Sequence, residues 1–148
     1  MKTSGMTSIV KDTARLVAGF IAVFGVYIAA TGHLTPGGGF AGGVILAAAA
    51  VLVVLAFGKE FSAKLIDESR CHVWDAAGAA GFLAVALCGY FVGQFFTNFL
   101  SLGEAHTLRS GGGIPLSNLA ILVKVGAGLA GAFLALSAFR RAGSIREE

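Results

Sequence analysis

Long apolar runs alternate with short polar connections along the 148 residues of this chain. The apolar runs cover residues 16–34, 40–58, 76–97 and 116–139. A helix needs roughly 20 apolar residues to cross a hydrocarbon core of about 30 Å, and each run satisfies that requirement. The pattern therefore predicts four transmembrane helices that form a single membrane domain, residues 1–148.

The connection between the first two runs is very short and reads Thr-Pro-Gly-Gly-Gly over residues 35–39. Pro36 has no backbone N–H, and the glycines that follow it tolerate positive φ, which suits an abrupt reversal of the chain. We therefore expect the first two helices to form a tight antiparallel hairpin. The segment lacks the Gly-Lys-Ser/Thr ending of a phosphate-binding loop, which argues against nucleotide binding.

The composition narrows the class of protein further. Hydrophobic residues make up 56% of the chain and charged residues only 13%, whereas soluble domains carry roughly 25% charged residues. So few charges cannot cover a water-facing surface, and disordered chains are poor in apolar residues. The expected fold class is an all-α integral membrane protein that is rich in glycine.

Basic residues are unevenly distributed among the connections. Nine of the 11 fall in three segments, namely the amino end, the loop 59–75 and the carboxyl tail: Lys2, Lys11, Arg15, Lys59, Lys64, Arg70, Arg140, Arg141 and Arg146. Since Lys and Arg are retained on the cytoplasmic side, we expect both termini of a multi-pass protein of the cytoplasmic membrane to face the cytoplasm. The basic residues form no single stripe, so no nucleic-acid partner is expected.

Lys124 is an exception, because it lies about eight residues into the fourth run, roughly 12 Å from its start. A charge at such depth costs on the order of 2.5–3.5 kcal/mol on insertion scales. No acidic residue lies inside the four runs, so a carboxylate partner is expected from another subunit or from a loop. Lys124 is a candidate proton relay or gating charge; alternatively, its side chain extends to the membrane surface.

Two further polar residues lie near the ends of the runs. His33, beside the Pro-Gly turn, is either a proton or cation relay or a helix-end histidine that bonds terminal carbonyls, and the residue alone favours the second interpretation. Asp75, just before the third run, fits an acidic residue at a helix N-terminus.

Small residues recur four positions apart, which lets helices approach closely in lipid. The pairs are Gly38/Gly42, Gly39/Gly43, Gly89/Gly93 and Ala127/Gly131. They fit packing against partner subunits and packing within the four-helix unit equally well. The sequence has no nucleophile triad or metal-ligand cluster, and Cys71 and Cys88 match no disulfide or metal pattern. We therefore expect a non-catalytic subunit without a metal site.

Gly32-His33, followed by Pro36-Gly37-Gly38-Gly39-Phe40 and Gly42-Gly43, resembles the signature of the MnhB/MrpB family. These are small subunits of Mrp-type multisubunit Na+/H+ antiporters, and related subunits occur in membrane-bound hydrogenases and other redox complexes. The resemblance implies an accessory subunit, without a cofactor of its own, that helps couple Na+ and H+ movement together with other membrane subunits. The positions that we match to the family, residue by residue, are Lys124, His33, Pro36, Gly37, Gly38, Gly39, Gly42 and Gly43.

The fourth run departs from the antiporter pattern, in which we expect a Phe-Asp-Leu-Gly-Val-like stretch with an acidic residue. The Lys-Val-Gly-Ala-Gly stretch of residues 124–128 instead resembles the form found in hydrogenase-type modules. The expected function is therefore ion translocation in the antiporter-like module of a redox-driven, membrane-bound hydrogenase-type complex. The alternatives are the MrpB-type component of a stand-alone Mrp antiporter, a structural scaffold protein, and a small homo-oligomeric transporter.

Overall fold

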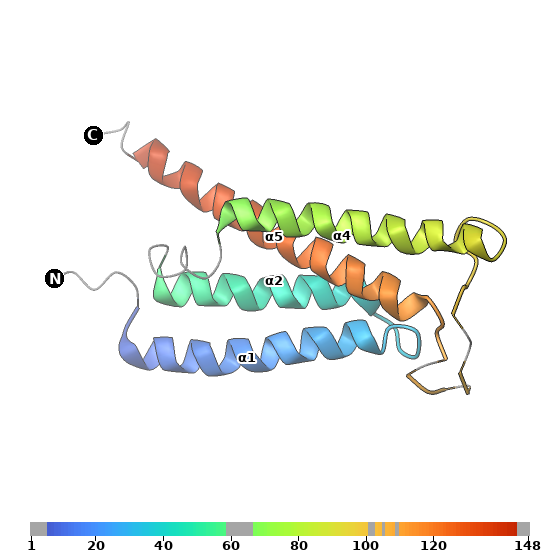
Figure 1. Ribbon diagram of the computed structural model, residues 1–148. Helices are drawn as coiled ribbons and strands as arrows, with labels where there is room; N and C mark the ends of the chain where they lie inside the picture. The colour runs from blue at the N-terminus through green and yellow to red at the C-terminus, as the bar shows by residue number, and fades with distance from the viewer. Residues whose placement is uncertain (1–5, 59–66, 101–102, 105, 109, 145–148) are drawn as a thin grey trace.

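Four long helices form an elongated bundle, in agreement with the predicted all-α membrane fold (Figure 1). The computed structural model describes residues 6–58, 67–100, 103–104, 106–108 and 110–144, with residues 138–144 described by their backbone alone. The helices are α1 (Ser8–Ala30), α2 (Gly38–Phe57), α4 (Glu68–Cys88) and α5 (Ile114–Ser144), with a short 3-10 helix η1 (Gly89–Phe91) after α4. All four long helices are apolar and long enough to cross a membrane.

The order of the helices in space is α1, α2, α5, α4, because α2 packs against both α1 and α5, and α5 packs against α4. Helix α5 crosses the bundle obliquely (Figure 1). The end of α1, the start of α2, the end of α4 and the start of α5 lie together at one end, which we call the turn end. The start of α1, the end of α2, the start of α4 and the end of α5 lie toward the other end, which we call the terminal end. Four of the basic residues on which the predicted orientation rests lie outside the described residues, namely Lys2, Lys59, Lys64 and Arg146.

The predicted hairpin of the first two helices is present. Helix α1 ends at Ala30, and the Thr31 backbone N–H and hydroxyl both donate to the carbonyl of Tyr27, at 3.0 and 2.9 Å. Gly37 and Gly38 then adopt φ values of 141° and 69°, which side chains with a Cβ rarely permit. The reversal after Pro36 therefore depends on these two glycines.

The third helix differs most from its prediction. It begins at Glu68, well before residue 76, and its α-helical part ends at Cys88. Residues 92–97 do not continue it. Instead, the chain folds back, so that the Phe96 N–H donates to the carbonyl of Ala86 at 3.1 Å. The hydropathy pattern assigned this aromatic segment to the membrane helix because its residues are apolar. It missed the first turns of α4 because they are polar, although they follow an N-cap at Asp67 and include Glu68, an acidic residue favourable at a helix start.

Glycines bring the helices close together inside the unit. A Cβ on Gly42 would lie 3.1 Å from both Ala29 Cβ and Leu122 Cδ1, and one on Gly43 would lie 2.7 Å from Val125 Cβ. A Cβ on Gly131 would lie 3.1 Å from Cys71 Cβ. At these positions the small residues therefore serve packing within the chain itself.

Candidate functional site

Lys124 and Asp75 form an ion pair between α5 and α4. Lys124 Nζ donates to Asp75 Oδ1 at 2.8 Å. Asp75 lies seven residues into α4, about 10 Å along its axis, rather than at the start of a helix as predicted. The carboxylate partner of Lys124 therefore comes from the segment 59–75 that the sequence analysis assigned to a loop, but the structure places Asp75 inside α4, which begins earlier than hydropathy indicated.

Two glycines permit this pair to form. A Cβ on Gly78 would lie 2.6 Å from the Lys124 backbone nitrogen, so α4 and α5 touch at backbone distance beside the lysine. On the opposite helix, a Cβ on Gly128 would lie 3.4 Å from Asp75 Oδ1. Each charged residue thus sits against a glycine of the other helix, and the Gly78 contact in particular requires the absence of a side chain.

The two charged groups lie at the edge of the bundle rather than in its centre. The side chain of Lys124 is 47% exposed and that of Asp75 is 37% exposed in the isolated chain. Lys124 nevertheless lies ten residues into α5, about 15 Å along the axis and within the apolar span Ile114–Ser137. The pair therefore presents charge at membrane depth on the outside of the four-helix unit.

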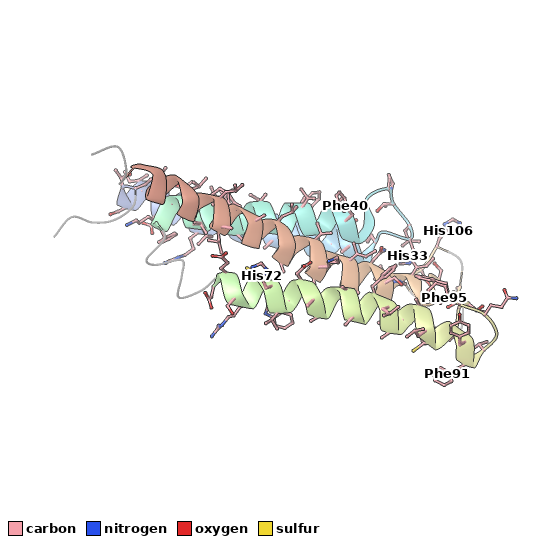
Figure 2. All side chains as sticks on the ribbon, turned by 90° about the horizontal axis from the view of Figure 1, so that it is seen from above. His33, Phe40, His72, Phe91, Phe95 and His106 are labelled. Atoms are coloured by element: carbon pink, nitrogen blue, oxygen red, sulfur yellow. The ribbon has the colours of Figure 1, made fainter. Side chains whose placement is uncertain are left out.

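His33 lies at the turn end, where it joins two connections that are far apart in sequence. Its Nε2 lies 3.1 Å from the carbonyl oxygen of Thr107, across 74 positions of the chain. The ring also packs on Gly111, where an added Cβ would lie 2.9 Å from His33 Cγ. The partner carbonyl thus belongs to the connection before α5 and not to the end of α1. Figure 2 shows His33 at the same end as His106 and Phe95, whereas His72 lies away from them, near the start of α4.

Asn118 is a polar residue of α5 that the sequence pattern did not single out. Its Oδ1 accepts the Gly39 N–H at 3.3 Å, and the Asn118 backbone directly faces Gly39, where any Cβ would collide with its carbonyl oxygen. A Cβ on Gly32 would lie 2.6 Å from Asn118 Nδ2. The Asn118 side chain therefore packs directly against the glycines of the turn, where no larger residue would leave room for it. An asparagine in an apolar run is itself a sign that could have identified it.

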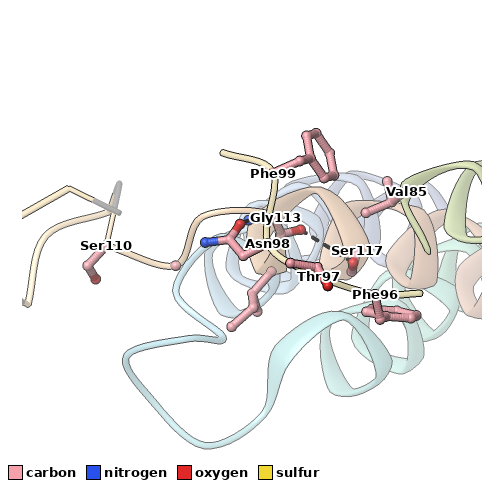
Figure 3. A pocket seen from close by; sticks show the side chains of 10 residues that line it. Val85, Phe96, Thr97, Asn98, Phe99, Ser110, Gly113 and Ser117 are labelled. Carbon is pink, nitrogen blue, oxygen red and sulfur yellow. Dashed lines mark hydrogen bonds between the residues drawn. The ribbon is translucent and has the colours of Figure 1, made fainter. Parts of the chain in front are cut away.

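A cavity of about 370 Å³ opens beside this junction, between the end of α4 and the start of α5 (Figure 3). Its polar lining comes from Thr97, Asn98, Ser110 and Ser117, and its apolar lining includes Phe96 and Phe99. Asn98 joins the two ends of the connection before α5, because its Oδ1 accepts the Gly113 N–H at 2.9 Å and the Leu100 N–H at 3.3 Å. Gly111 lines the cavity as well as contacting His33.

The structure separates the predicted site residues into two groups. His33, the turn glycines and the start of α5 meet at the turn end, whereas Lys124 lies farther along α5 with Asp75. Within the described residues, no three His, Cys, Asp or Glu side chains are placed to hold a metal ion.

Comparison with known proteins gives consistent results. The model of the family described as "Domain related to MnhB subunit of Na+/H+ antiporter" matches residues 9–131. A protein of Staphylococcus haemolyticus named as antiporter subunit mnhB2 is 30% identical over 138 residues, which cover 87% of this chain and 93% of that protein. A Na+/H+ antiporter subunit of Bacillus subtilis is 34% identical over 59% of this chain and 57% of its own length.

Two further similarities involve longer proteins. An uncharacterised protein of Methanocaldococcus jannaschii is 35% identical over 88% of this chain, which spans only 52% of that protein. A chain in the structure of the membrane-bound sulfane sulfur reductase, an archaeal respiratory membrane complex, has a TM-score of 0.71 and 34% identity. That similarity covers 88% of this chain and 60% of the other.

Proposed function

This chain belongs to the MnhB family, and we propose that it is an accessory ion-translocation subunit that helps couple Na+ and H+ movement. As an MnhB-type protein it is a multi-pass subunit of an antiporter-like membrane complex. The finer role rests chiefly on one observation, the 2.8 Å ion pair between Lys124 and Asp75 in the membrane-spanning helices.

The exposure of this pair indicates why the chain acts within a complex. Ionisable groups inside membranes almost always face a protein interior or a water-filled cavity, because lipid solvates them poorly. Lys124 and Asp75 instead reach the outside of the isolated unit. In the complex, their face is therefore covered by a neighbouring membrane protein or by water at the interface with it. In our proposal, Lys124 responds there to proton or cation occupancy in a shared path.

His33 occupies the outer end of this path in our proposal, and both termini face the cytoplasm. The turn end would then face outward, which agrees with the concentration of basic residues on the other connections. A histidine suits this position because an imidazole ordinarily titrates close to neutrality, so small changes in surroundings alter its charge.

The parent complex is, in our proposal, redox-driven. The similarity to a chain of the sulfane sulfur reductase complex supports this assignment, and so does the lysine in the fourth helix where the antiporter pattern has an acid. The hydrogenase type is one member of this redox-driven class. The alternative, a stand-alone Mrp-type antiporter, is favoured by the antiporter-subunit relatives in Staphylococcus and Bacillus.

Purification of the complex distinguishes these two assignments. A tag on the carboxyl end and extraction in mild detergent should recover the partner subunits, which mass spectrometry then identifies. Iron–sulfur or nickel–iron subunits among them would support the redox-driven complex, whereas antiporter-type membrane proteins alone would support the gradient-driven exchanger. Recovery of a homo-oligomer of this chain would contradict both.

The ion-path role is tested by removing both charges of the Lys124–Asp75 pair together, so that neither charge is left unpaired in the membrane. The double variant Lys124→Ala/Asp75→Asn has no uncompensated charge and should assemble, but its coupled Na+ and H+ transport in membrane vesicles should fall at least several-fold. Lys124→Arg, which keeps the charge, serves as the matched control. Normal coupled transport by a fully assembled double variant would contradict the role of Lys124 and favour a purely structural scaffold.

A further inference from the structure

Two buried nitrogen atoms at the turn end have no hydrogen-bond partner within the described part of the chain. They are His33 Nδ1 and Asn118 Nδ2. Buried polar atoms in folded proteins are hydrogen-bonded in the great majority of cases, to protein or to ordered water. Two such atoms in one region therefore indicate that something polar lies between or beside them.

The other contacts of these side chains define what each free atom can do. His33 Nε2 faces the carbonyl oxygen of Thr107 at 3.1 Å, so it carries the hydrogen and donates it. In the neutral ring, Nδ1 is then an acceptor. Asn118 Oδ1 accepts the Gly39 N–H at 3.3 Å, which assigns the amide hydrogens to Nδ2 and makes it a donor.

Both groups belong to the same junction between the α1–α2 turn and the start of α5. Gly32, which precedes His33, would place a Cβ 2.6 Å from Asn118 Nδ2. Gly111, against which the His33 ring packs, would place a Cβ 3.0 Å from Pro115 Cδ, one helical turn before Asn118. Asn118, in the first turns of α5, therefore lies against Gly32, the residue that precedes His33 in the connection between α1 and α2.

One free donor and one free acceptor restrict the chemistry of the ligand. A cation is excluded because the N–H groups of Asn118 would repel it. An anion is excluded because the lone pair on His33 Nδ1 would repel it. A water molecule can accept from the amide and donate to the imidazole at once, and internal waters typically make about three such bonds. The cavity of about 370 Å³ lies beside this junction, since its lining includes Gly111, which contacts His33, and Ser117, the neighbour of Asn118 in α5.

We propose that one internal water molecule bridges Asn118 Nδ2 and His33 Nδ1 at the turn end. The water links the connection between α1 and α2 to α5 and completes the hydrogen bonding of the His33 tautomer that carries its hydrogen on Nε2. This inference goes beyond the proposed function and does not depend on it, because the water would be present whether or not ions pass this histidine.

The test is magic-angle-spinning NMR of the purified complex with ¹⁵N-labelled histidine in this chain. The chain has three histidines, and a His33→Gln variant identifies the signal of His33. We expect an unprotonated Nδ1 that receives magnetisation from water. In Asn118→Leu, which removes the donor and fills the space, this transfer should fall several-fold, while the signal of the exposed His72 stays unchanged as the control.

A protonated Nδ1, an absence of transfer from water, or unchanged transfer in an assembled Asn118→Leu complex would each overturn the proposal. An electron cryomicroscopy map of the unmodified complex provides a second test, which does not require the Asn118→Leu variant to assemble. Density for one water within hydrogen-bond reach of both nitrogens would support the bridge. A protein side chain in that place, or contact of either nitrogen with another group, would refute it.

Discussion

Lys124 on α5 and Asp75 on α4 are joined at 2.8 Å, and each lies against a glycine of the opposite helix. The lysine backbone faces Gly78, and the carboxylate faces Gly128. Charge and close packing therefore depend on the same contact. A change that separates the two helices would also separate the charges, and this relationship leads to the first two predictions.

Gly78→Val should separate α4 from α5. The new Cβ would lie 2.6 Å from the Lys124 nitrogen and 2.8 Å from its Cα, and backbone atoms cannot move aside as a flexible side chain can. Overpacking of this kind costs about 1–3 kcal/mol. The melting temperature of the purified complex should fall by several degrees. The matched control is Gly19→Ala, since a Cβ at Gly19 meets nothing within 4 Å inside the chain.

Reversal of one charge at the pair should be more harmful than exchange of both. Lys124→Asp alone places two acidic groups together inside the membrane, and Asp75→Lys alone places two basic groups there. Each should lower the amount of assembled complex several-fold, as judged by native electrophoresis of membranes. The double exchange should restore much of it, because contacting residues couple by about 0.5–3 kcal/mol. Additive losses in the double variant would show that the pair is not coupled.

Gly39→Ala should disrupt the contact between α2 and α5. Any Cβ at this position would collide with the carbonyl oxygen of Asn118, so the hairpin must move away from α5 and the bond from the Gly39 N–H to Asn118 Oδ1 must lengthen. We expect reduced accumulation of the chain in membranes, measured by immunoblotting. Gly93→Ala is the control, because its Cβ would meet only Thr97 Oγ1, at 4.0 Å. Equal accumulation of both variants would contradict this packing role.

The two ends of the bundle should be accessible from opposite sides of the membrane. In intact cells or spheroplasts, a membrane-impermeant maleimide should label His106→Cys, at the exposed turn end, but not Ser69→Cys, at the exposed start of α4. After permeabilisation, both should react. The unsubstituted chain controls for Cys71, which is buried, and Cys88. The reverse pattern would show that the termini face outward and would invert the proposed ion path.

Bulky substitutions at Gly89 or Gly131 do not distinguish a scaffold from an ion-path subunit. A Cβ at Gly89 would lie 2.6 Å from the Thr97 nitrogen, and one at Gly131 would lie 3.1 Å from Cys71 Cβ. Both glycines therefore pack within the chain itself, and their replacement would damage its own fold in either case. Only the charge-neutral change at Lys124 and Asp75 separates the two functions.

The amino-acid sequence alone was enough to establish the class of protein, the number of spanning helices and the hairpin around Pro36. These features follow from local properties: the length of an apolar run, the absence of charge, and the backbone freedom of glycine. The same local properties identified Lys124 as a charge at membrane depth and His33 as a residue beside the turn.

Which residues meet became evident only from the packing of the helices. Asp75 looked like a helix-start acid because hydropathy cannot tell where a helix with polar first turns begins, and its contact with Lys124 joins residues 49 positions apart. Asn118 likewise gained its role from the packing of α5 against the turn glycines, 79 positions from Gly39. Contacts between distant segments depend on how helices cross, and no local pattern of hydrophobic and polar residues records that geometry.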